Sequence, residues 1–327
     1  MGRQIPDGQM TLLSILLMML LPLGGERSAG EEKDEILAVF WNLENFFDYF
    51  DDGTSESESE FSSQGAKHWT KKRFLTKCEA VAKSIFYISD LKGKVPDIFA
   101  VAEVENKRVL KKLLSETLLR KLDYVPVHYD SDDPRGIDVA LLYRKSRLKL
   151  VSDGIRRIGE FRTRDMLFCC FETSGSDSLS FIVCHHPSKY GGAASQQKRL
   201  AAARELVTLS DSLSLQGWHS QIAFGDFNDT SSAEQFSLLE KIYVNLSEPL
   251  SKKGEGSIRF NGHWELIDLC FVTADLERKS QVQVLRIPFL MEKDASHGGL
   301  KPFRTYLGPA YHGGVSDHCP IAIAIHE

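Results

Sequence analysis

Apolar residues recur along most of the chain in short runs, and their spacing separates two kinds of element. Short apolar or alternating runs bounded by turn residues predict β-strands, and apolar residues three or four positions apart predict helices. The predicted strands are residues 36–45, 97–104, 124–129, 137–143, 148–158, 166–173, 179–186, 221–228, 266–273, 284–291 and 320–326. The predicted helices are residues 71–88, 107–119, 194–213 and 233–241. Many strands with few helices predict an α+β fold, in which helices cover two packed sheets.

The first thirty residues follow a different pattern. Residues 11–23 are almost wholly apolar, and Gly24, Gly25 and the small residues Ser28, Ala29 and Gly30 follow them. This pattern predicts a secretory signal peptide over residues 1–29, because the apolar run is too short to span a bilayer. A short uncleaved membrane anchor is the alternative. We therefore expect export to the periplasm or the extracellular space, and one domain over residues 30–327.

Charge narrows the choice of substrate. The chain has 45 acidic and 40 basic residues, so its net charge is only -5. Proteins that coat nucleic acid usually carry a strong overall positive charge, which this chain lacks. A polyanionic substrate would have to meet a local basic patch or a bound metal, and four basic residues near polar segments are candidates for the patch: Arg135, Lys189, Arg199 and Arg204.

The six cysteines do not form a metal or redox motif. Four of them lie in apolar runs that are predicted as strands, Cys319 directly precedes another, and none is part of a Cys-x-x-Cys pair. We therefore expect buried small apolar side chains rather than a set of disulfides. An acidic, serine-rich segment, residues 51–63, is predicted to be a mobile surface loop.

Polar residues gather where the predicted strands end. Four segments carry them: Asn42 and Glu44, Glu103, Asp226 and Asn228, and Asp317 and His318. One carboxylate at a strand end is more often a turn former than a catalyst. Four such segments in one chain instead indicate an assembled chemical site. Because carboxylate and amide oxygens suit Mg²⁺, Mn²⁺ or Ca²⁺, we expect one of these ions, with Mg²⁺ preferred. The absence of a His-Glu-x-x-His motif argues against a zinc peptidase.

These segments, in this order, resemble the signature blocks of the endonuclease/exonuclease/phosphatase family. The blocks are Asn-Leu-Glu at residues 42–44, Glu103, Gly-Asp-Phe-Asn at 225–228 and Ser-Asp-His at 316–318. The resemblance extends from residue 36 to the end of the chain and is closest to a secreted bacterial branch. It implies the four-layer sandwich of deoxyribonuclease I, two packed mixed sheets flanked by helices, and metal-dependent hydrolysis of phosphate esters.

The resemblance also implies a role for each matching residue. Glu103 would be the main metal ligand, with Asn42 and Asp317 beside it and Glu44 as a weaker candidate. The implied catalytic residues are Asp226, Asn228, His318, Asp268, His185 and Asp138.

Asp226 would position or deprotonate the attacking water, and Asn228 would donate a hydrogen bond to a phosphoryl oxygen. Asp268 would orient His318 and favour its charged or base-competent form. Whether Asp226 or His318 takes the proton from water stays open.

His185, paired with Asp138, would hold the phosphate from the opposite side, where an imidazole that titrates near neutral pH suits the task. The adjacent His186 makes this assignment ambiguous, because only one of two neighbouring strand residues points inward. The other histidines are predicted to be structural or solvent-facing: His68, His128, His219, His263, His297 and His312.

Substrate is the least constrained inference, because one fold serves many phosphoesters. A nuclease that cleaves DNA or RNA is the leading hypothesis. A lipid or small-molecule phosphoesterase, of the sphingomyelinase or inositol phosphatase kind, is the alternative, although no aromatic cluster for docking to a membrane is evident. A non-catalytic binding protein is the third reading. We expect no stable membrane contact, and the sequence indicates no protein partner.

Overall fold

The computed structural model describes residues 35–326, apart from residues 54, 160, 176, 190 and 191. The predicted signal peptide, residues 1–29, lies outside the described residues. No helix in the described part of the chain combines the length and the apolar character needed to cross a membrane.

The first sheet has six strands in the order β13-β18-β1-β2-β4-β3. Their bounds are β1 Glu35–Phe46, β2 Ile98–Val104, β3 Tyr124–His128, β4 Asp138–Arg144, β13 Ser280–Val284 and β18 Ile321–His326. The central pair, β1 and β2, is parallel, and every other pairing is antiparallel. The sheet is therefore mixed, and the chain's first and last described strands lie side by side within it.

The second sheet also has six strands, in the order β5-β6-β7-β8-β12-β9. Their bounds are β5 Leu148–Arg156, β6 Met166–Thr173, β7 Ser178–His185, β8 Ser220–Asp226, β9 Tyr243–Asn245 and β12 Asp268–Thr273. Here β7 and β8 are the parallel pair. Three two-stranded ribbons complete the strands: β10 Ile258–Phe260 with β11 His263–Glu265, β14 Met291–Lys293 with β15 Leu300–Pro302, and β16 Tyr306–Leu307 with β17 Ala310–Tyr311.

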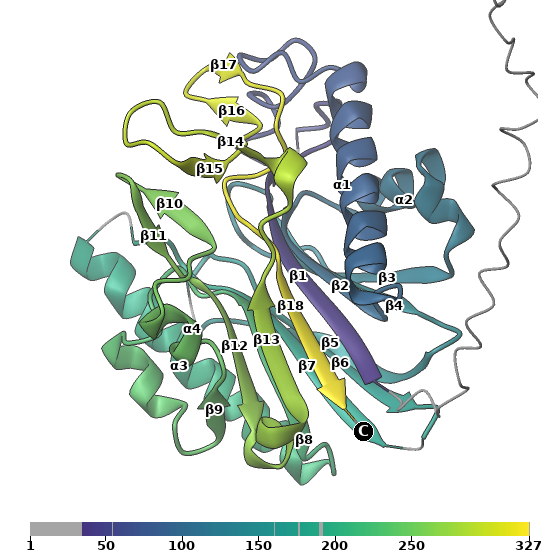
Figure 1. The fold of residues 1–327 in the computed structure, drawn as a ribbon, viewed down its shortest axis with the longest axis vertical. Helices are drawn as coiled ribbons and strands as arrows, with labels where there is room; N and C mark the ends of the chain where they lie inside the picture. The colour runs from purple at the N-terminus through teal and green to yellow at the C-terminus, as the bar shows by residue number, and fades with distance from the viewer. Residues whose placement is uncertain (1–34, 54, 160, 176, 190–191, 327) are drawn as a thin grey trace, which may run out of the picture. The chain divides into compact units, whose positions relative to one another are not determined.

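Helices cover the outer faces of both sheets (Figure 1). The α-helices are α1 Lys71–Lys92, α2 Lys107–Glu116, α3 Gly192–Leu215 and α4 Glu248–Lys252, and the short 3₁₀ helices are η2 Leu118–Lys121, η3 Glu234–Leu238, η4 Ala274–Lys279 and η5 Pro288–Leu290. The Thr70 hydroxyl and the Asn106 side chain accept hydrogen bonds from first-turn N–H groups of α1 and α2. Gly93 ends α1 in the left-handed conformation.

Side-chain alternation along β1 divides the apolar interior into two parts. Ile36, Ala38 and Phe40 point toward the second sheet, where Phe40 meets Phe224 edge to face. The residues between them, such as Leu37 and Val39, belong to the cluster beneath α1 and α2. The result is a layered α+β sandwich of two mixed sheets flanked by helices, as predicted. All six cysteines are buried, as predicted, and each is free in this structure.

Two predicted elements are wrong. Residues 284–291 do not form a strand, because β13 ends at Val284 and Pro288, which has no N–H to donate to a ladder, begins the 3₁₀ helix η5. Residues 233–241 do not form an α-helix; only the short helix η3 is present, and no side chain caps its start at Ala233. A five-residue segment without a cap forms too few hydrogen bonds to offset the free-energy cost of nucleating an α-helix.

The acidic segment at residues 51–63 packs against the molecule instead of projecting from it as a loose surface loop. Phe61 is buried and stacks on Phe47 with ring centroids 4.9 Å apart, and it meets Tyr306 edge to face. Glu58 of the same segment is 1% exposed. The acidic, serine-rich composition of this segment predicted a mobile loop, but one aromatic residue, Phe61, anchors it to the core.

Burial gives Glu105, which follows β2, an unusual protonation equilibrium. Burial, together with the nearby Asp48 and Glu58 carboxylates, raises the pKa of Glu105 from 4.5 to about 9, although the Asp48 N–H opposes the shift. Between these two pH values the folded chain holds a proton that the unfolded chain releases. The contribution of this group to stability is therefore complete below pH 4.5 and is lost as pH rises toward 9.

We expect Glu105→Gln, which keeps the shape but does not titrate, to stabilise the protein at pH 8 by up to about 5 kcal/mol relative to the unsubstituted chain, since each pH unit above 4.5 costs the folded state about 1.4 kcal/mol. The difference should vanish near pH 4.5, where both chains are uncharged at this position. Urea denaturation at the two pH values measures it, with the exposed Glu240→Gln as the matched control. Equal stabilisation at both pH values would rule out the titration as its cause.

Candidate functional site

The ends of strands from both sheets bring the four polar segments together. In the first sheet, Asn42 of β1 lies opposite Ala102 of β2, one residue before Glu103. In the second sheet, Asp226 at the end of β8 lies between two partners, His185 of β7 and Asp268 of β12. Because the two sheets pack face to face, these strand ends meet, and the contacts described below connect them.

Asp226 lies at the centre of the site and is 2% exposed. Its Oδ2 accepts a hydrogen bond from Asn42 Nδ2 at 3.0 Å, and its Oδ1 accepts one from the backbone N–H of Asn228 at 2.8 Å. The Nε2 atoms of His185 and His318 lie 3.6 and 3.9 Å from the same Oδ2. One buried carboxylate therefore contacts residues from three distant chain segments, in addition to its near neighbour Asn228. The Asn228 amide donates to the backbone carbonyl of His186 at 2.9 Å.

His318 is held rigidly from three sides. Its Nδ1 lies 2.8 Å from Asp268 Oδ2, which directs Nε2 toward Asp226. The Ser316 hydroxyl accepts a hydrogen bond from the His318 backbone N–H, and the Trp41 indole donates to the His318 carbonyl oxygen. Burial alone would lower the pKa of this imidazole, but the Asp268 carboxylate outweighs burial and holds the pKa well above its ordinary value.

Asp226 and His318 have pKa values displaced from the ordinary range in a way that suits catalysis. Burial, with a smaller contribution from Asp268, raises the pKa of Asp226 to about 7, although His318 and the hydrogen bonds from Asn42 and Asn228 oppose the shift. A carboxylate with such a pKa can exchange a proton with water at neutral pH. The neighbouring imidazole stays charged over the same range.

Of the two adjacent histidines, the structure places His185 in the site. Its Nε2 lies between Glu103 Oε1, at 3.8 Å, and Asp226. The His186 ring instead packs edge to face on Phe227 and is completely buried. Burial and the nearby Arg164 guanidinium lower the pKa of His185 well below its ordinary value, so this imidazole is neutral rather than poised to titrate near pH 6.5.

The expected pairing of His185 with Asp138 is wrong. Asp138 begins β4 and lies opposite Val104 of the first sheet, whereas His185 belongs to β7 of the second sheet. Asp138 accepts a hydrogen bond from the Ser131 N–H at 3.1 Å and faces His128 Nε2 at 3.5 Å. It therefore belongs to a separate group of side chains beside the site.

The remaining carboxylates, Glu44, Glu103 and Asp317, gather around two cations. The Lys77 ammonium and the Arg304 guanidinium each interact electrostatically with all three of them. Arg304 bridges two directly, with Nε 3.0 Å from Glu44 Oε1 and Nη2 3.1 Å from Asp317 Oδ2. The structure thus brings together the acidic residues that were expected to hold a metal.

Left-handed backbone conformations position several of these residues. Glu44, Asn45, Glu103 and Asn228 have φ between +46° and +61°, which non-glycine residues seldom adopt. The turn at Glu44 and Asn45 lets the Asn45 N–H donate to Glu103 Oε2 at 2.8 Å, which joins the ends of β1 and β2. Strain of this kind is common where function dictates side-chain direction.

The donor chemistry fits a hard divalent cation. Glu103 and Asp317 are partly exposed, while the Asn42 Oδ1 atom adds an amide oxygen close by and accepts the Glu44 N–H. Glu44 fits less well, because Arg304 and the Thr305 N–H occupy its two oxygens. Oxygen donors from few carboxylates, with room for water, are what Mg²⁺ prefers.

Three basic residues at the site were not anticipated from the sequence: Lys77, Arg164 and Arg304. Lys77 donates to the Glu44 carbonyl oxygen and to the Thr305 hydroxyl, and burial lowers its pKa to about 8. A signal for it existed, since Lys77 lies on the apolar face of the helix predicted from residue 71. Arg304 had none, because it lies in a segment without a motif. Of the basic residues expected to form a patch, three pair with acidic groups of the protein: Arg135, Lys189 and Arg199.

Comparison with known proteins agrees with this geometry. A sequence profile described as the Endonuclease/Exonuclease/phosphatase family matches residues 37–327. A protein of that family from Bacteroides thetaiotaomicron has a similar structure, with a TM-score of 0.55 at 15% identity, over 89% of this chain and 97% of the other. Truncated TDP2 from Caenorhabditis elegans gives a TM-score of 0.58 at 16% identity, over 90% and 98%.

A third similar structure is D. rerio TDP2 complexed with a single-strand DNA product, with a TM-score of 0.56 at 13% identity, over 90% of this chain and 99% of the other. No curated protein matched this chain. At such low identities the solved structures show a common fold, while the profile spans nearly the entire described chain and each of the four polar segments. The chain belongs to the endonuclease/exonuclease/phosphatase family, whose chemistry, with this cluster of carboxylates and imidazoles, supports a phosphoester hydrolase.

Proposed function

We propose that this protein is a metal-dependent phosphodiesterase that cleaves nucleic acid by attack of an activated water on phosphorus. The observation that carries the proposal is the placement of Asp226, a buried carboxylate within 4 Å of two imidazoles and hydrogen-bonded to two asparagines. A structural ion pair would not require three distant chain segments to converge on one oxygen atom. Hydrolysis of a phosphodiester does require a base, hydrogen-bond donors and positive charge around one phosphate.

In this proposal Asp226 removes the proton from the attacking water, since its pKa lies near neutrality. His318, kept charged by Asp268, donates a hydrogen bond from Nε2 to a phosphoryl oxygen. Neutral His185 donates or accepts a hydrogen bond on the opposite side. A divalent cation, held by Glu103, Asp317 and Asn42, would neutralise charge on the phosphate and on the leaving oxygen.

Nucleic acid is the proposed substrate, and export is the proposed destination of the protein. The bound product in the D. rerio TDP2 structure supports the first proposal, because the two chains have the same fold. The apolar segment at residues 11–23, followed by small residues, supports the second. The net charge of the protein is negative and would not attract nucleic acid, so binding in this proposal depends on contacts close to the site.

Activity toward three substrates tests the proposal: plasmid DNA, bis-p-nitrophenyl phosphate and sphingomyelin, each with Mg²⁺, with Mn²⁺ and with EDTA. We expect hydrolysis of the first two with either metal and a loss of at least about 100-fold in EDTA, because the carboxylate cluster then lacks its cation. Hydrolysis of sphingomyelin alone would replace the nuclease proposal with a lipid phosphodiesterase. No metal-dependent turnover on any substrate would favour a binding protein.

Substitution of Asp268 separates the charge state of His318 from its position. In Asp268→Asn the amide can still accept a hydrogen bond from Nδ1, but the charge that raises the pKa of His318 is gone. We expect kcat to fall about 100-fold and the alkaline limit of the pH profile to move to lower pH, because the imidazolium loses its proton earlier. A fall in kcat without a shift of that limit would contradict the proposed role for the imidazolium.

A further inference from the structure

A second group of side chains that could hold a metal ion lies at the loop end of the β3–β4 hairpin. His128 ends β3, Asp138 begins β4, and Asp130 lies in the loop between them. One potential ligand atom from each of the three lies within 4.8 Å of the others. Asp226, Asp268 and His318 form the other group of this kind in the described part of the chain, and no residue is common to both.

The His128 ring is buried, and its two nitrogens are free to bind a ligand. It is 1% exposed, and neither ring nitrogen has a hydrogen-bond partner among the described residues. Nδ1 lies 3.8 Å from Asp130 Oδ1 and Nε2 lies 3.5 Å from Asp138 Oδ2. Both distances exceed a hydrogen bond. One ion binds only one nitrogen of an imidazole, and the 3.5 Å between Nε2 and Asp138 Oδ2 is close to the separation of about 3.4 Å between two ligand atoms on one tetrahedral zinc ion.

Burial of an imidazole without hydrogen bonds costs about 1–3 kcal/mol, so a structure seldom keeps one without a reason. Asp165 adds a second orphaned group nearby, since its Oδ2 is buried and has no hydrogen-bond partner within the described structure. Burial, with smaller contributions from the Asp138 and Asp132 carboxylates, raises the pKa of Asp165 to about 6, although Arg157 opposes the shift. The Asp138 carboxylate, which faces His128, therefore lies close enough to Asp165 for the two carboxylates to repel each other.

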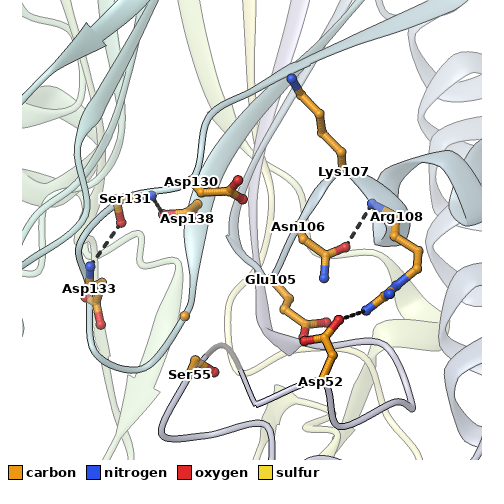
Figure 2. Close-up of a pocket in the computed structure, with 11 residues that line it drawn as sticks. Asp52, Ser55, Glu105, Asn106, Lys107, Arg108, Asp130, Ser131, Asp133 and Asp138 are labelled. Atoms are coloured by element: carbon orange, nitrogen blue, oxygen red, sulfur yellow. Dashed lines mark hydrogen bonds and ion pairs between the residues drawn. The ribbon is translucent and has the colours of Figure 1, made fainter.

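A cavity of about 460 Å³ gives ions access to this group. Figure 2 shows Asp130, Ser131 and Asp138 along one wall of the cavity, with Asn106 and Lys107 across from them. The Asp130 side chain is 85% exposed, while Asp138 lies deeper and is held by the Ser131 N–H. A hydrated ion can therefore reach both carboxylates from the cavity, and the buried His128 Nε2 lies 3.5 Å from the inner one, Asp138.

We propose that His128, Asp130 and Asp138 bind a divalent d-block cation, of which Zn²⁺ is the preferred example, at a site separate from the catalytic one. One ring nitrogen and two carboxylate oxygens would supply three ligands and leave a fourth position to water. An imidazole ligand favours Zn²⁺, Co²⁺ or Mn²⁺ over Mg²⁺, whereas the oxygen donors around Glu103 favour Mg²⁺. The bound ion ties the loop at residues 129–137 to the strands on either side of it.

Direct metal binding to the full chain tests the proposal without reference to activity. Co²⁺ absorption and Zn²⁺ calorimetry would be measured in a Glu103→Gln background, which weakens the proposed catalytic metal site. Three further substitutions are compared there: His128→Gln, Asp130→Asn and, as a matched charge control, Asp132→Asn. Asp132 lies in the same loop and is 65% exposed, but it does not belong to the three-residue group.

We expect one Zn²⁺ per chain in the Glu103→Gln background, and visible Co²⁺ bands of a four-coordinate site. Zn²⁺ affinity should fall at least tenfold in His128→Gln and in Asp130→Asn, and should not change in Asp132→Asn. Should His128→Gln fail to fold, the exposed Asp130→Asn substitution decides the question. Absence of Zn²⁺ binding in the background chain, or equal affinity with and without the Asp130 carboxylate, would overturn the proposal.

Discussion

Asp226→Asn should lower kcat toward bis-p-nitrophenyl phosphate by about 1000-fold or more while the protein remains folded. The amide has the same size and can still accept the Asn228 N–H and occupy the space between the two imidazoles. It cannot take a proton from water, and this is the step that the buried carboxylate is proposed to perform. KM should change much less than kcat, because the lost interaction belongs to the transition state.

Asp211→Asn on the exposed face of α3 provides the matched control, because it removes the same charge at a distance from the site. Its kcat should equal that of the unsubstituted protein. Thermal unfolding of both variants would establish that they are folded. A folded Asp226→Asn variant with more than a tenth of normal kcat would exclude Asp226 as the base and leave His318 as the remaining candidate.

Gly225→Ala should destabilise the protein by about 3 kcal/mol or more, which is among the larger effects of a single substitution. Gly225 has φ of +151°, and a Cβ at this position would lie 2.0 Å from the carbonyl oxygen of Cys184 on the neighbouring parallel strand. Neither backbone can move away without breaking the β7–β8 ladder. Because Asp226 and His185 are the next residues on these strands, activity should fall along with stability.

Gly93→Ala separates steric overlap from backbone strain. Gly93 also has positive φ, at +73°, but an added Cβ there meets nothing within 4 Å. We expect a loss of about 1 kcal/mol for the left-handed conformation alone. Guanidinium denaturation of both variants measures the difference. Equal losses would mean that the contact with Cys184 contributes little and that the β7–β8 pair is more pliable than the structure indicates.

The periodicity of apolar residues predicted most strands, because each buried strand needs its own run of apolar side chains. It did not predict where strands end. At β1, strict alternation would put Asn42 and Glu44 on one face of the strand, but the left-handed turn at Glu44 and Asn45 breaks that alternation. At η5, whether Pro288 continues a strand or starts a 3₁₀ helix depends on where the hydrogen bonds of β13 end, and apolar periodicity carries no information about that point.

At the site, the sequence predicted those residues that lie in short motifs with other functional residues beside them in the chain. They did not reveal contacts between distant segments. Arg304 pairs with Glu44 across 260 residues, and no local pattern marks it. The pairing of Asp138 depends on which sheet its strand joins, so His128 rather than His185 is its neighbour. Contacts of this kind follow from sheet order, and sheet order follows from the packing of the whole chain.

The left-handed residues at the strand ends have a consequence for how this protein would evolve in the laboratory. Of the six non-glycine residues with positive φ in the described chain, four lie at the site: Glu44, Asn45, Glu103 and Asn228. Each costs on the order of 1 kcal/mol that glycine would recover. A population of variants selected only for survival of heating should therefore accumulate glycine at these positions. The thermal stability of such variants would rise while they lost the four side chains at the site, and with them their activity.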